Sequence, residues 1–150
     1  MAKFNFGIAH VNFSLRGEES LADEVFVKKF AKTLKVSYHT ICFDTNAFAE
    51  KEKLSTQVAA RILRYTWFEE IRIKNNYDFI ATGHYAEVRQ HNNGRYVISK
   101  GLDETKDQSY VLWGLQQDLL SRTLLPLGSY RKSEIRQMAE DYGYPELAKK

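Results

Sequence analysis

The stretch "FIATGHYAEV", residues 79–88, decides how the chain is organised. It opens with apolar and β-branched residues, which predict a buried strand. Gly83, His84 and Tyr85 follow directly, and none of them suits the interior of a parallel sheet. Ligands of open parallel sheets gather beyond the carboxyl ends of the strands. The stretch is therefore either a strand end that carries a ligand site or only the place where a strand stops.

The residues before this stretch alternate between strand and helix patterns. Runs rich in β-branched and aromatic residues predict strands, and apolar residues at helical spacing predict helices. In chain order, the predicted elements are a strand at 4–13, a helix at 21–35, a strand at 36–44, a helix at 56–76 and a strand at 77–83. Ser20 and Ser55 are the predicted caps of the two helices. The alternation predicts a Rossmann-like parallel sheet with right-handed crossovers.

The residues after the stretch follow a different pattern. "YAEVRQ" and "YVISKG" flank the Asn-Gly turn "HNNGR" and predict a β-hairpin. Helices are predicted at 106–115, at 116–128 and at 134–143, the last capped by Ser133 and stopped by Gly143. We expect residues 1–85 to form the Rossmann-like part and residues 86–150 the hairpin and helical part, together in one compact unit.

The composition limits the classes of protein to which the chain can belong. Its 150 residues are 43% hydrophobic, enough for a single core, and its net charge of +3 permits a nucleic-acid partner without implying one. A single cysteine, Cys42, excludes an internal disulfide, and its apolar neighbours predict a buried, inert thiol. No Cys or His pair has metal-ligand spacing, and no apolar stretch is long enough for a membrane helix. We expect a soluble, cytoplasmic protein without a metal site or membrane contact.

Gly83 and His84 each allow two interpretations. The glycine either serves a turn or lets the backbone approach a nucleotide closely. The histidine is either an ordinary hydrogen-bonded residue or a functional one, and lone histidines are more often the former.

Two further stretches carry groups that suit anions. The chain has no glycine-rich phosphate loop of a known pattern. Arg61 and Arg64 lie one turn apart on a predicted helix, where they either contact phosphates or form a solvated face. "GLDETKDQSY", residues 101–110, precedes a predicted helix and is either an anion site or an ordinary loop with Asp107 at the helix start.

Longer motifs add two resemblances. "IAHVNFSLRGEES" and "STQVAARILRYTWFEE" resemble the N-terminal domain of tRNA(Ile)-lysidine synthetase, an ATP-dependent ligase, over about residues 6–80. "ATGHYAEV", "GRYVISKGLDETKDQSYVLWGL" and "LLPLGSYRKSEIRQMAE" resemble the tRNA-specific 2-thiouridylase over about residues 79–150. Both families are similar to the PP-loop ATP pyrophosphatases, which adenylate a substrate on a Rossmann-like sheet.

The resemblances imply a set of ligands and contacts. The cofactor would be ATP with magnesium, and the partners would be tRNA and, for the thiouridylase, a sulfur-donor protein. Gly83 would contact ATP, and Arg61 and Arg64 would lie on the nucleotide or tRNA side. The residues implied to face tRNA are His84, Lys106, Asp107 and Gln108.

The two resemblances together suggest a hybrid that joins within residues 77–85. The serine-glycine-glycine phosphate loop of both families and the two catalytic cysteines of the thiouridylase do not occur in the chain, so we expect it to be inactive alone. A tRNA-binding module without catalysis and an engineered chain made only to fold are the alternatives. Because the families' first strand is central, we expect the strand at 80–83 to pair with the strand at 7–11, or a second copy to fill the gap by strand swapping.

Overall fold

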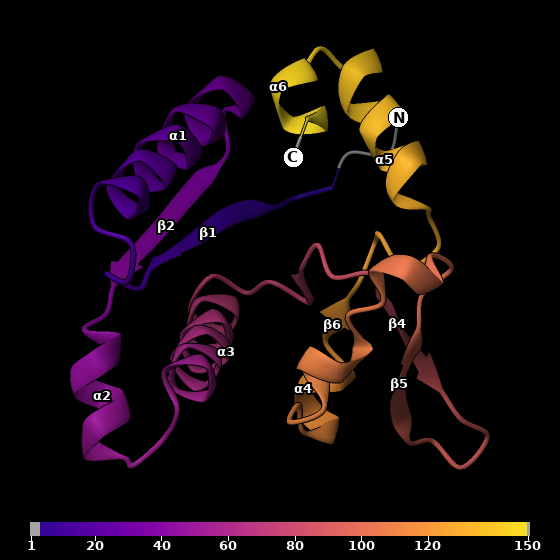
Figure 1. Cartoon of the computed structure of the whole chain (residues 1–150). Helices are drawn as coiled ribbons and strands as arrows, with labels where there is room; N and C mark the ends of the chain where they lie inside the picture. The colour runs from indigo at the N-terminus through magenta and orange to yellow at the C-terminus, as the bar shows by residue number, and fades with distance from the viewer. Residues whose placement is uncertain (1–3, 150) are drawn as a thin grey trace. The chain divides into compact units, whose positions relative to one another are not determined.

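The computed structural model describes residues 4–149 and shows an α/β chain with parallel strand pairs, a β-hairpin and C-terminal helices (Figure 1). This confirms the predicted fold class. The chain forms two compact units, residues 1–77 and 78–150. Within the described residues, no helix combines the length and apolar character that crossing a membrane requires.

The first unit contains the predicted βαβ element. Its elements are β1 (Gly7–Asn12), α1 (Glu18–Leu34), β2 (Ser37–Cys42), α2 (Thr45–Lys51) and α3 (Thr56–Lys74). Strands β1 and β2 pair in parallel from Gly7 opposite Ser37 to Asn12 opposite Cys42, and α1 is the crossover between them. The carboxyl ends of both strands therefore lie side by side.

Of the two helix caps predicted in this unit, the structure confirms one. The prediction for Ser55 is confirmed, since its Oγ accepts a hydrogen bond from the Val58 N–H at 3.3 Å. The prediction for Ser20 is wrong, because α1 begins at Glu18, and the Ser20 hydroxyl instead accepts the N–H of Arg16 in the preceding loop. The polar passage between β2 and α3 forms α2, which the prediction missed and which Asp44 caps through the Ala47 N–H.

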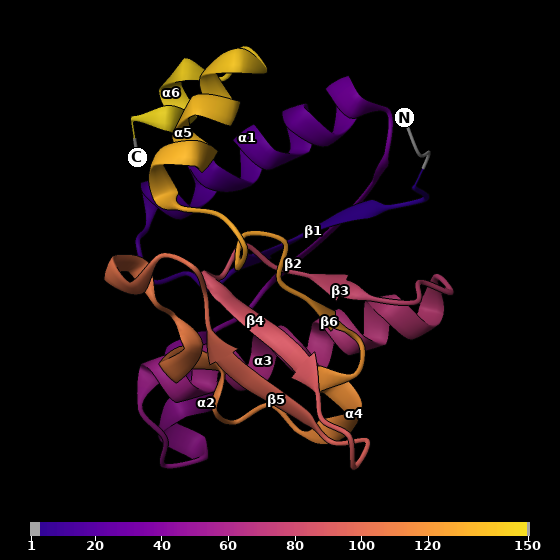
Figure 2. The ribbon, with the colours of Figure 1, turned by 90° about the vertical axis from the view of Figure 1, so that its right-hand side faces the viewer.

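The second unit contains the predicted hairpin and several shorter elements (Figure 2). These are β3 (Ile80–Ala81), β4 (Ala86–Gln90), β5 (Tyr96–Lys100), two 3₁₀ turns (Glu104–Lys106 and Ser109–Leu112), α4 (Gln117–Leu120), β6 (Thr123–Leu124), α5 (Lys132–Asp141) and α6 (Pro145–Ala148). Strands β4 and β5 pair antiparallel with Val88 opposite Ile98. Gly94 takes a φ of 82° in the connecting turn, which explains the Asn-Gly signal.

The strand pairing in this unit corrects two predictions. The helix expected at 116–128 ends at Leu120, and Thr123–Leu124 form β6, which pairs in parallel with β3. The Ile80 N–H donates to the Arg122 carbonyl at 2.8 Å. Among residues 4–149, β3 bonds to β6 and β1 bonds to β2, so the expected direct pairing of residues 80–83 with residues 7–11 is not formed.

Two expected helices also differ in detail. The helix predicted at 106–115 is replaced by 3₁₀ turns, because Asp103 and Asp107 bond to nearby backbone N–H groups and compete with helical bonds. Ser133 does not cap α5, which begins at Lys132, and the Lys132 N–H is bound by the Asp103 carboxylate at 2.9 Å. Gly143 does stop α5, with a φ of 84°.

Close backbone packing joins three segments of the second unit at the start of β4. A Cβ added to Gly128 would overlap the carbonyl oxygen of Ala86. One added to Gly101 would lie 2.9 Å from the Gly128 oxygen, which already accepts the Leu102 N–H at 2.7 Å. Both positions therefore require glycine, and they hold the loop after β5 and the segment after β6 against the beginning of β4.

Candidate functional site

The sequence-predicted residues of the second unit come together around Tyr85. The Tyr85 N–H donates to Oε1 of Gln108 at 3.0 Å, and the Gln108 N–H donates to the Tyr85 carbonyl at 3.0 Å. This reciprocal pair fastens the strand end to the 3₁₀ turns. His84 and Lys106 are thereby brought to one region of the same unit.

Gln108 and Asp107 differ in the groups that they leave available. The side-chain carbonyl of Gln108 is used by Tyr85, whereas its Nε2 donates to no residue of the described chain. Both carboxylate oxygens of Asp107 are used locally, by the N–H of Ser109 at 3.1 Å and by its hydroxyl at 2.9 Å. Asp107 thus shapes the turn, and Gln108 keeps a donor.

Lys106 closes the first 3₁₀ turn with its N–H bonded to the Asp103 carbonyl at 3.0 Å. Its side chain is exposed and forms no ion pair within the described part of the chain. Lys132 approaches from α5 and places its ammonium 5.8 Å from the centre of the Tyr85 ring. Lys132 therefore lies over the Tyr85 ring, whereas Lys106 lies two residues before Gln108, which bonds to Tyr85.

Asp103, which the prediction did not single out, connects these lysines. The Lys132 N–H, then the Thr105 hydroxyl, hold the pKa of the Asp103 carboxyl below its ordinary value, with a smaller contribution from the Lys106 charge. The carboxylate therefore remains ionised and anchors α5 to the turn. The sequence signal that could have found it is the acid two residues before Thr105, which is typical of an Asx turn.

Tyr85 itself is a buried residue, only 7% exposed. Its hydroxyl is buried without a hydrogen-bond partner in the described structure. Burial, and secondly the Asp103 charge, raise the pKa of Tyr85, so the phenol stays neutral. Its role in this region is to support the surface groups around it.

Gly83 and His84 lie between β3 and β4. A Cβ added to Gly83 would meet only Leu127 at 3.6 Å, an ordinary contact, and its φ is not positive. The fold therefore does not require glycine at this position, in contrast to Gly128. Nδ1 of His84 lies 2.9 Å from the Thr82 hydroxyl, which orients the half-buried imidazole.

The predicted arginine pair belongs to the first unit. The Arg64 guanidinium lies over the Phe13 ring at 4.9 Å, and Phe13 directly follows the last residue of β1. Burial lowers the pKa of Arg64, and the neighbouring Arg61 charge lowers it further against a raising contribution from Tyr65. Within the described residues neither arginine pairs with a carboxylate. An unpaired, half-buried cationic pair thus lies next to a parallel strand end, where ligands of such sheets bind.

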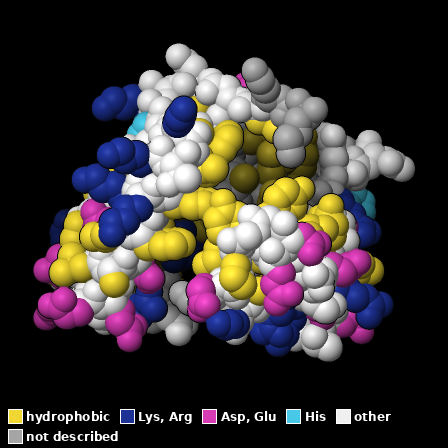
Figure 3. Space-filling view, turned by 90° about the horizontal axis from the view of Figure 1, so that it is seen from above, with side chains coloured by type: hydrophobic (Ala, Val, Ile, Leu, Met, Phe, Trp, Pro, Cys, Tyr) yellow, Lys and Arg dark blue, Asp and Glu magenta, His cyan; other side chains and the backbone are white. Residues whose placement is uncertain are grey.

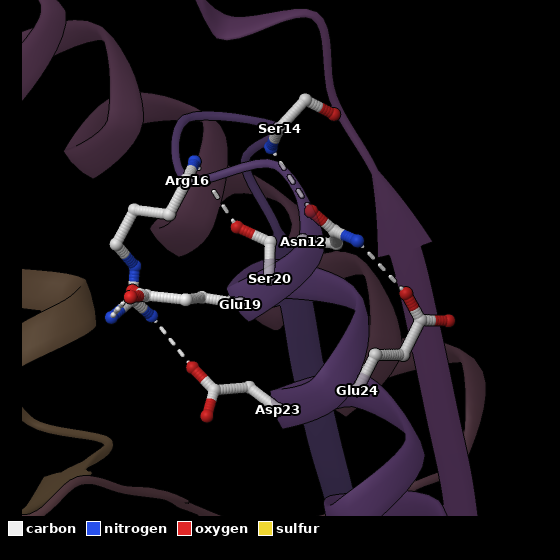
Figure 4. A network of polar contacts seen from close by, with 7 residues as sticks. All are labelled: Asn12, Ser14, Arg16, Glu19, Ser20, Asp23 and Glu24. Carbon is white, nitrogen blue, oxygen red and sulfur yellow. Dashed lines mark hydrogen bonds and ion pairs between the residues drawn. The ribbon is translucent and has the colours of Figure 1, made fainter.

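A polar network fixes the loop at the same strand end (Figure 4). Asn12, 3% exposed, donates to the Glu24 carboxylate at 3.0 Å and accepts the Ser14 N–H at 3.0 Å. The Thr40 hydroxyl donates to the other Glu24 oxygen, so α1 is tied to both strands. Cys42 is exposed at the end of β2 with its sulfur 3.1 Å from the Ser14 hydroxyl, so the prediction of a buried thiol is wrong.

One face of the molecule is mixed in charge (Figure 3). On the face shown in Figure 3, Lys and Arg side chains occur together with Asp and Glu side chains, and hydrophobic side chains are exposed between them. In residues 4–149 no group of three or more His, Cys, Asp or Glu side chains is placed to hold a metal ion. On this face, anion recognition would therefore depend on individual contacts rather than on a broad cationic field.

Comparisons with known proteins agree with this architecture. A family model described as a PP-loop domain matches residues 1–90, and one described as a tRNA methyl transferase HUP domain matches residues 56–150. A tRNA-specific 2-thiouridylase of Cytophaga hutchinsonii is 61% identical over 77 residues, which are 51% of this chain and 21% of that protein. The 2-thiouridylase of Halothermothrix orenii is 35% identical over 142 residues, which are 93% of this chain and 35% of that protein.

The parallel strand ends and the match over residues 1–90 define a PP-loop protein. Within that class, the chain belongs to the family of the tRNA methyl transferase HUP domain, whose model matches residues 56–150. The chain spans about a fifth to a third of the length of the curated relatives it matches. Because one 2-thiouridylase aligns with 93% of the chain, a second family is not needed to account for the N-terminal half.

Proposed function

We propose that this chain is part of an ATP-dependent tRNA-modifying enzyme of the 2-thiouridylase kind. In this proposal, residues 83–85 and 103–108 form part of its tRNA-binding surface. The observation that carries the proposal is the reciprocal hydrogen-bond pair between Tyr85 and Gln108, which joins His84 and Lys106 in one region. The relatives named tRNA-specific 2-thiouridylases support the choice of tRNA.

Each group in this region suits a different part of RNA. The exposed Lys106 ammonium suits a phosphate, which positions the RNA without reading its sequence. The unused Nε2 of Gln108 suits a base edge or a ribose hydroxyl. The His84 ring is held by the Thr82 hydroxyl, and in this proposal it also faces tRNA. Asp107 would act by holding the turn rather than by touching RNA.

ATP is the proposed cofactor, with magnesium carried on its phosphates. Gly83 has an open side where a Cβ would meet only Leu127, which suits the close approach of a nucleotide. Arg61 and Arg64 suit phosphate oxygens, because guanidinium groups bind them in a forked geometry. We propose the two contacts separately, one for each unit of the chain.

We further propose that this chain alone binds tRNA without modifying it. In support, the region around Tyr85 contains groups that suit RNA contacts, and the cysteine of the described chain, Cys42, belongs to the first unit. A sulfur-donor protein is the proposed second partner, and the cytoplasm is the proposed location. Purified chain mixed with tRNA, ATP and a sulfur donor should release no pyrophosphate, and release would contradict this part of the proposal.

A two-part origin remains a finer proposal. It rests only on the resemblance of the motifs within about residues 6–80 to lysidine synthetases. The DNA sequence across the coding region would test it, and a single reading frame homologous throughout to 2-thiouridylases would contradict it. Strand swapping between copies is also proposed, because the described sheets are two-stranded and leave strand edges unpaired. A strictly monomeric sedimentation profile would argue against it.

The tRNA proposal is tested by titrating an unmodified tRNA transcript at several salt concentrations. Lys106→Ala should weaken binding and reduce the slope of log affinity against log salt by about 1, because one phosphate contact is lost. Lys149→Ala is the matched control, since Lys149 is exposed but already pairs with Glu146 at 2.8 Å. Equal effects of both substitutions, or no binding by the unaltered chain, would overturn the proposal.

A further inference from the structure

Two aromatic side chains beside the candidate tRNA region are almost uncovered. Tyr110 is 70% exposed and Trp113 is 78% exposed. They lie in and directly after the 3₁₀ turn Ser109–Leu112. Trp113 continues the turn in a helical backbone conformation, so the two side chains, three residues apart, leave the backbone on the same side.

The turn that carries the rings is firmly held. Leu112, between them, is 1% exposed and anchors the turn in the core. At its start, Ser109 makes two bonds to Asp107, and the Val111 N–H donates to the Gln108 carbonyl at 3.1 Å. The rings are therefore presented to solvent by a fixed backbone rather than by a loose loop.

The structure points to an occupant for this face. We propose that Tyr110 and Trp113 form a platform on which one or two unpaired nucleobases of tRNA stack. The inference rests on the proposed tRNA-binding function and adds base contacts to the phosphate and ribose contacts assigned above. Unstacked RNA bases are commonly bound on aromatic side chains, and this stacking tolerates any base because each has a π-face.

Neighbouring residues favour RNA over a protein partner. Lys106 is exposed and unpaired one turn before Tyr110, where its charge suits the phosphate of a stacked nucleotide. The segments "KDQS" before the rings and "GLQQ" after them are polar or glycine, apart from the buried Leu115. Two isolated rings with an adjacent cation match a nucleotide better than the broader apolar core of a protein interface.

The intrinsic fluorescence of the chain allows a direct test. Of the two tryptophans, Trp67 is buried in α3 and Trp113 is exposed, so quenching by a stacked base reports on Trp113. The full chain is titrated with the tRNA transcript, with single-stranded oligouridylate and with an abasic RNA oligonucleotide of equal length. We expect quenching by the first two and none by the abasic strand, which has the same phosphates but no bases.

Substitutions separate stacking from charge. Trp113→Ala should weaken tRNA binding about tenfold without changing its salt dependence, whereas Trp113→Phe should restore most of the affinity because the ring remains. Both variants should keep the thermal stability of the parent, since the side chain is exposed.

Three outcomes would overturn the platform. If the transcript binds with the expected Lys106 dependence but neither quenches fluorescence nor responds to Trp113→Ala, the platform is wrong and the tRNA proposal stands. If the transcript does not bind at all, both fail. If Trp113 is quenched at rising protein concentration without RNA, a second copy covers the rings and the assignment to RNA is wrong.

Discussion

The backbone N–H of Tyr85 and the side-chain carbonyl of Gln108 are joined by a 3.0 Å hydrogen bond, and the Gln108 N–H returns a second bond of 3.0 Å to the Tyr85 carbonyl. Twenty-three residues separate the two partners in sequence. The pair holds the segment after β3 against the loop after β5. It is the contact on which the candidate tRNA-facing region depends.

Removing the Gln108 side chain should both destabilise the second unit and weaken tRNA binding. Gln108→Ala leaves the buried Tyr85 N–H without an acceptor, which should cost about 1–3 kcal/mol of unfolding free energy. Gln108→Glu keeps an acceptor oxygen but adds a negative charge toward RNA. We expect the Glu variant to unfold at nearly the parent urea concentration and to bind tRNA as poorly as the Ala variant. If it binds tRNA normally, Gln108 acts only in folding.

Two glycines should respond oppositely to alanine. Gly128→Ala places a methyl group against the Ala86 carbonyl oxygen and should destabilise the fold by about 1–3 kcal/mol or more, as overpacking does. Gly83→Ala meets only Leu127 at 3.6 Å and should leave the melting temperature almost unchanged. If Gly83 serves a nucleotide, the same substitution should weaken ATP binding in a calorimetric titration. Unchanged ATP affinity would remove Gly83 from the site.

The Arg61 charge should lower the stability of the fold and raise its affinity for anions. It lies one turn before Arg64 without a carboxylate partner in the described residues, and like charges at this spacing repel. Arg61→Gln should therefore raise the free energy of unfolding by about 0.2–0.5 kcal/mol and reduce the affinity for ATP or tripolyphosphate. Lys51→Gln on α2 is a control, because Lys51 is already 3.6 Å from Glu52. A loss of stability in Arg61→Gln would contradict the unpaired-charge interpretation.

Asp103 should contribute stability that depends on pH. The Lys132 N–H and the Thr105 hydroxyl hold its folded pKa below the ordinary value, so the folded state favours the ionised carboxylate. The contribution is complete above the unfolded pKa of about 4 and is lost as pH falls through the lower folded pKa. Asp103→Asn should be less stable than the parent at pH 7, with the difference disappearing in strongly acidic solution.

Urea unfolding between neutral and strongly acidic pH measures this difference. Glu104→Gln is a suitable control, because the exposed Glu104 side chain makes no hydrogen bond or ion pair within residues 4–149. A stability gap between parent and Asp103→Asn that persists unchanged at the acidic end would show that packing, and not ionisation, is responsible.

The sequence predicted elements best where a local group completes them. Ser55 caps α3 through a residue three positions away, and Gly94 supplies the positive φ that the hairpin turn needs. Two of the failed predictions have a tertiary cause. Thr123 and Leu124 follow apolar residues at helical spacing, which predicted a helix. They form a strand instead, because their backbone pairs with that of β3. Cys42 looked buried from its neighbours, yet it ends β2 beside the exposed loop at Ser14.

In the candidate site, too, some residues were predicted from the sequence and others were found only in the structure. Gly83, His84, Lys106, Asp107 and Gln108 were singled out through motif resemblance, and the structure supplies Asp103, Lys132, Tyr110 and Trp113 around them. Exposure of an aromatic side chain cannot be predicted from hydrophobicity, which by itself favours burial.

The sequence by itself determined the strand and helix alternation of the first unit, the hairpin and the Ser55 cap. Only the tertiary structure decided which strands pair, that Asp103 anchors α5, and that Tyr85 and Gln108 meet. The reason is physical. Local bonds join atoms whose separation the chain itself limits, whereas these partners are brought together by packing such as that of Gly128 against Ala86.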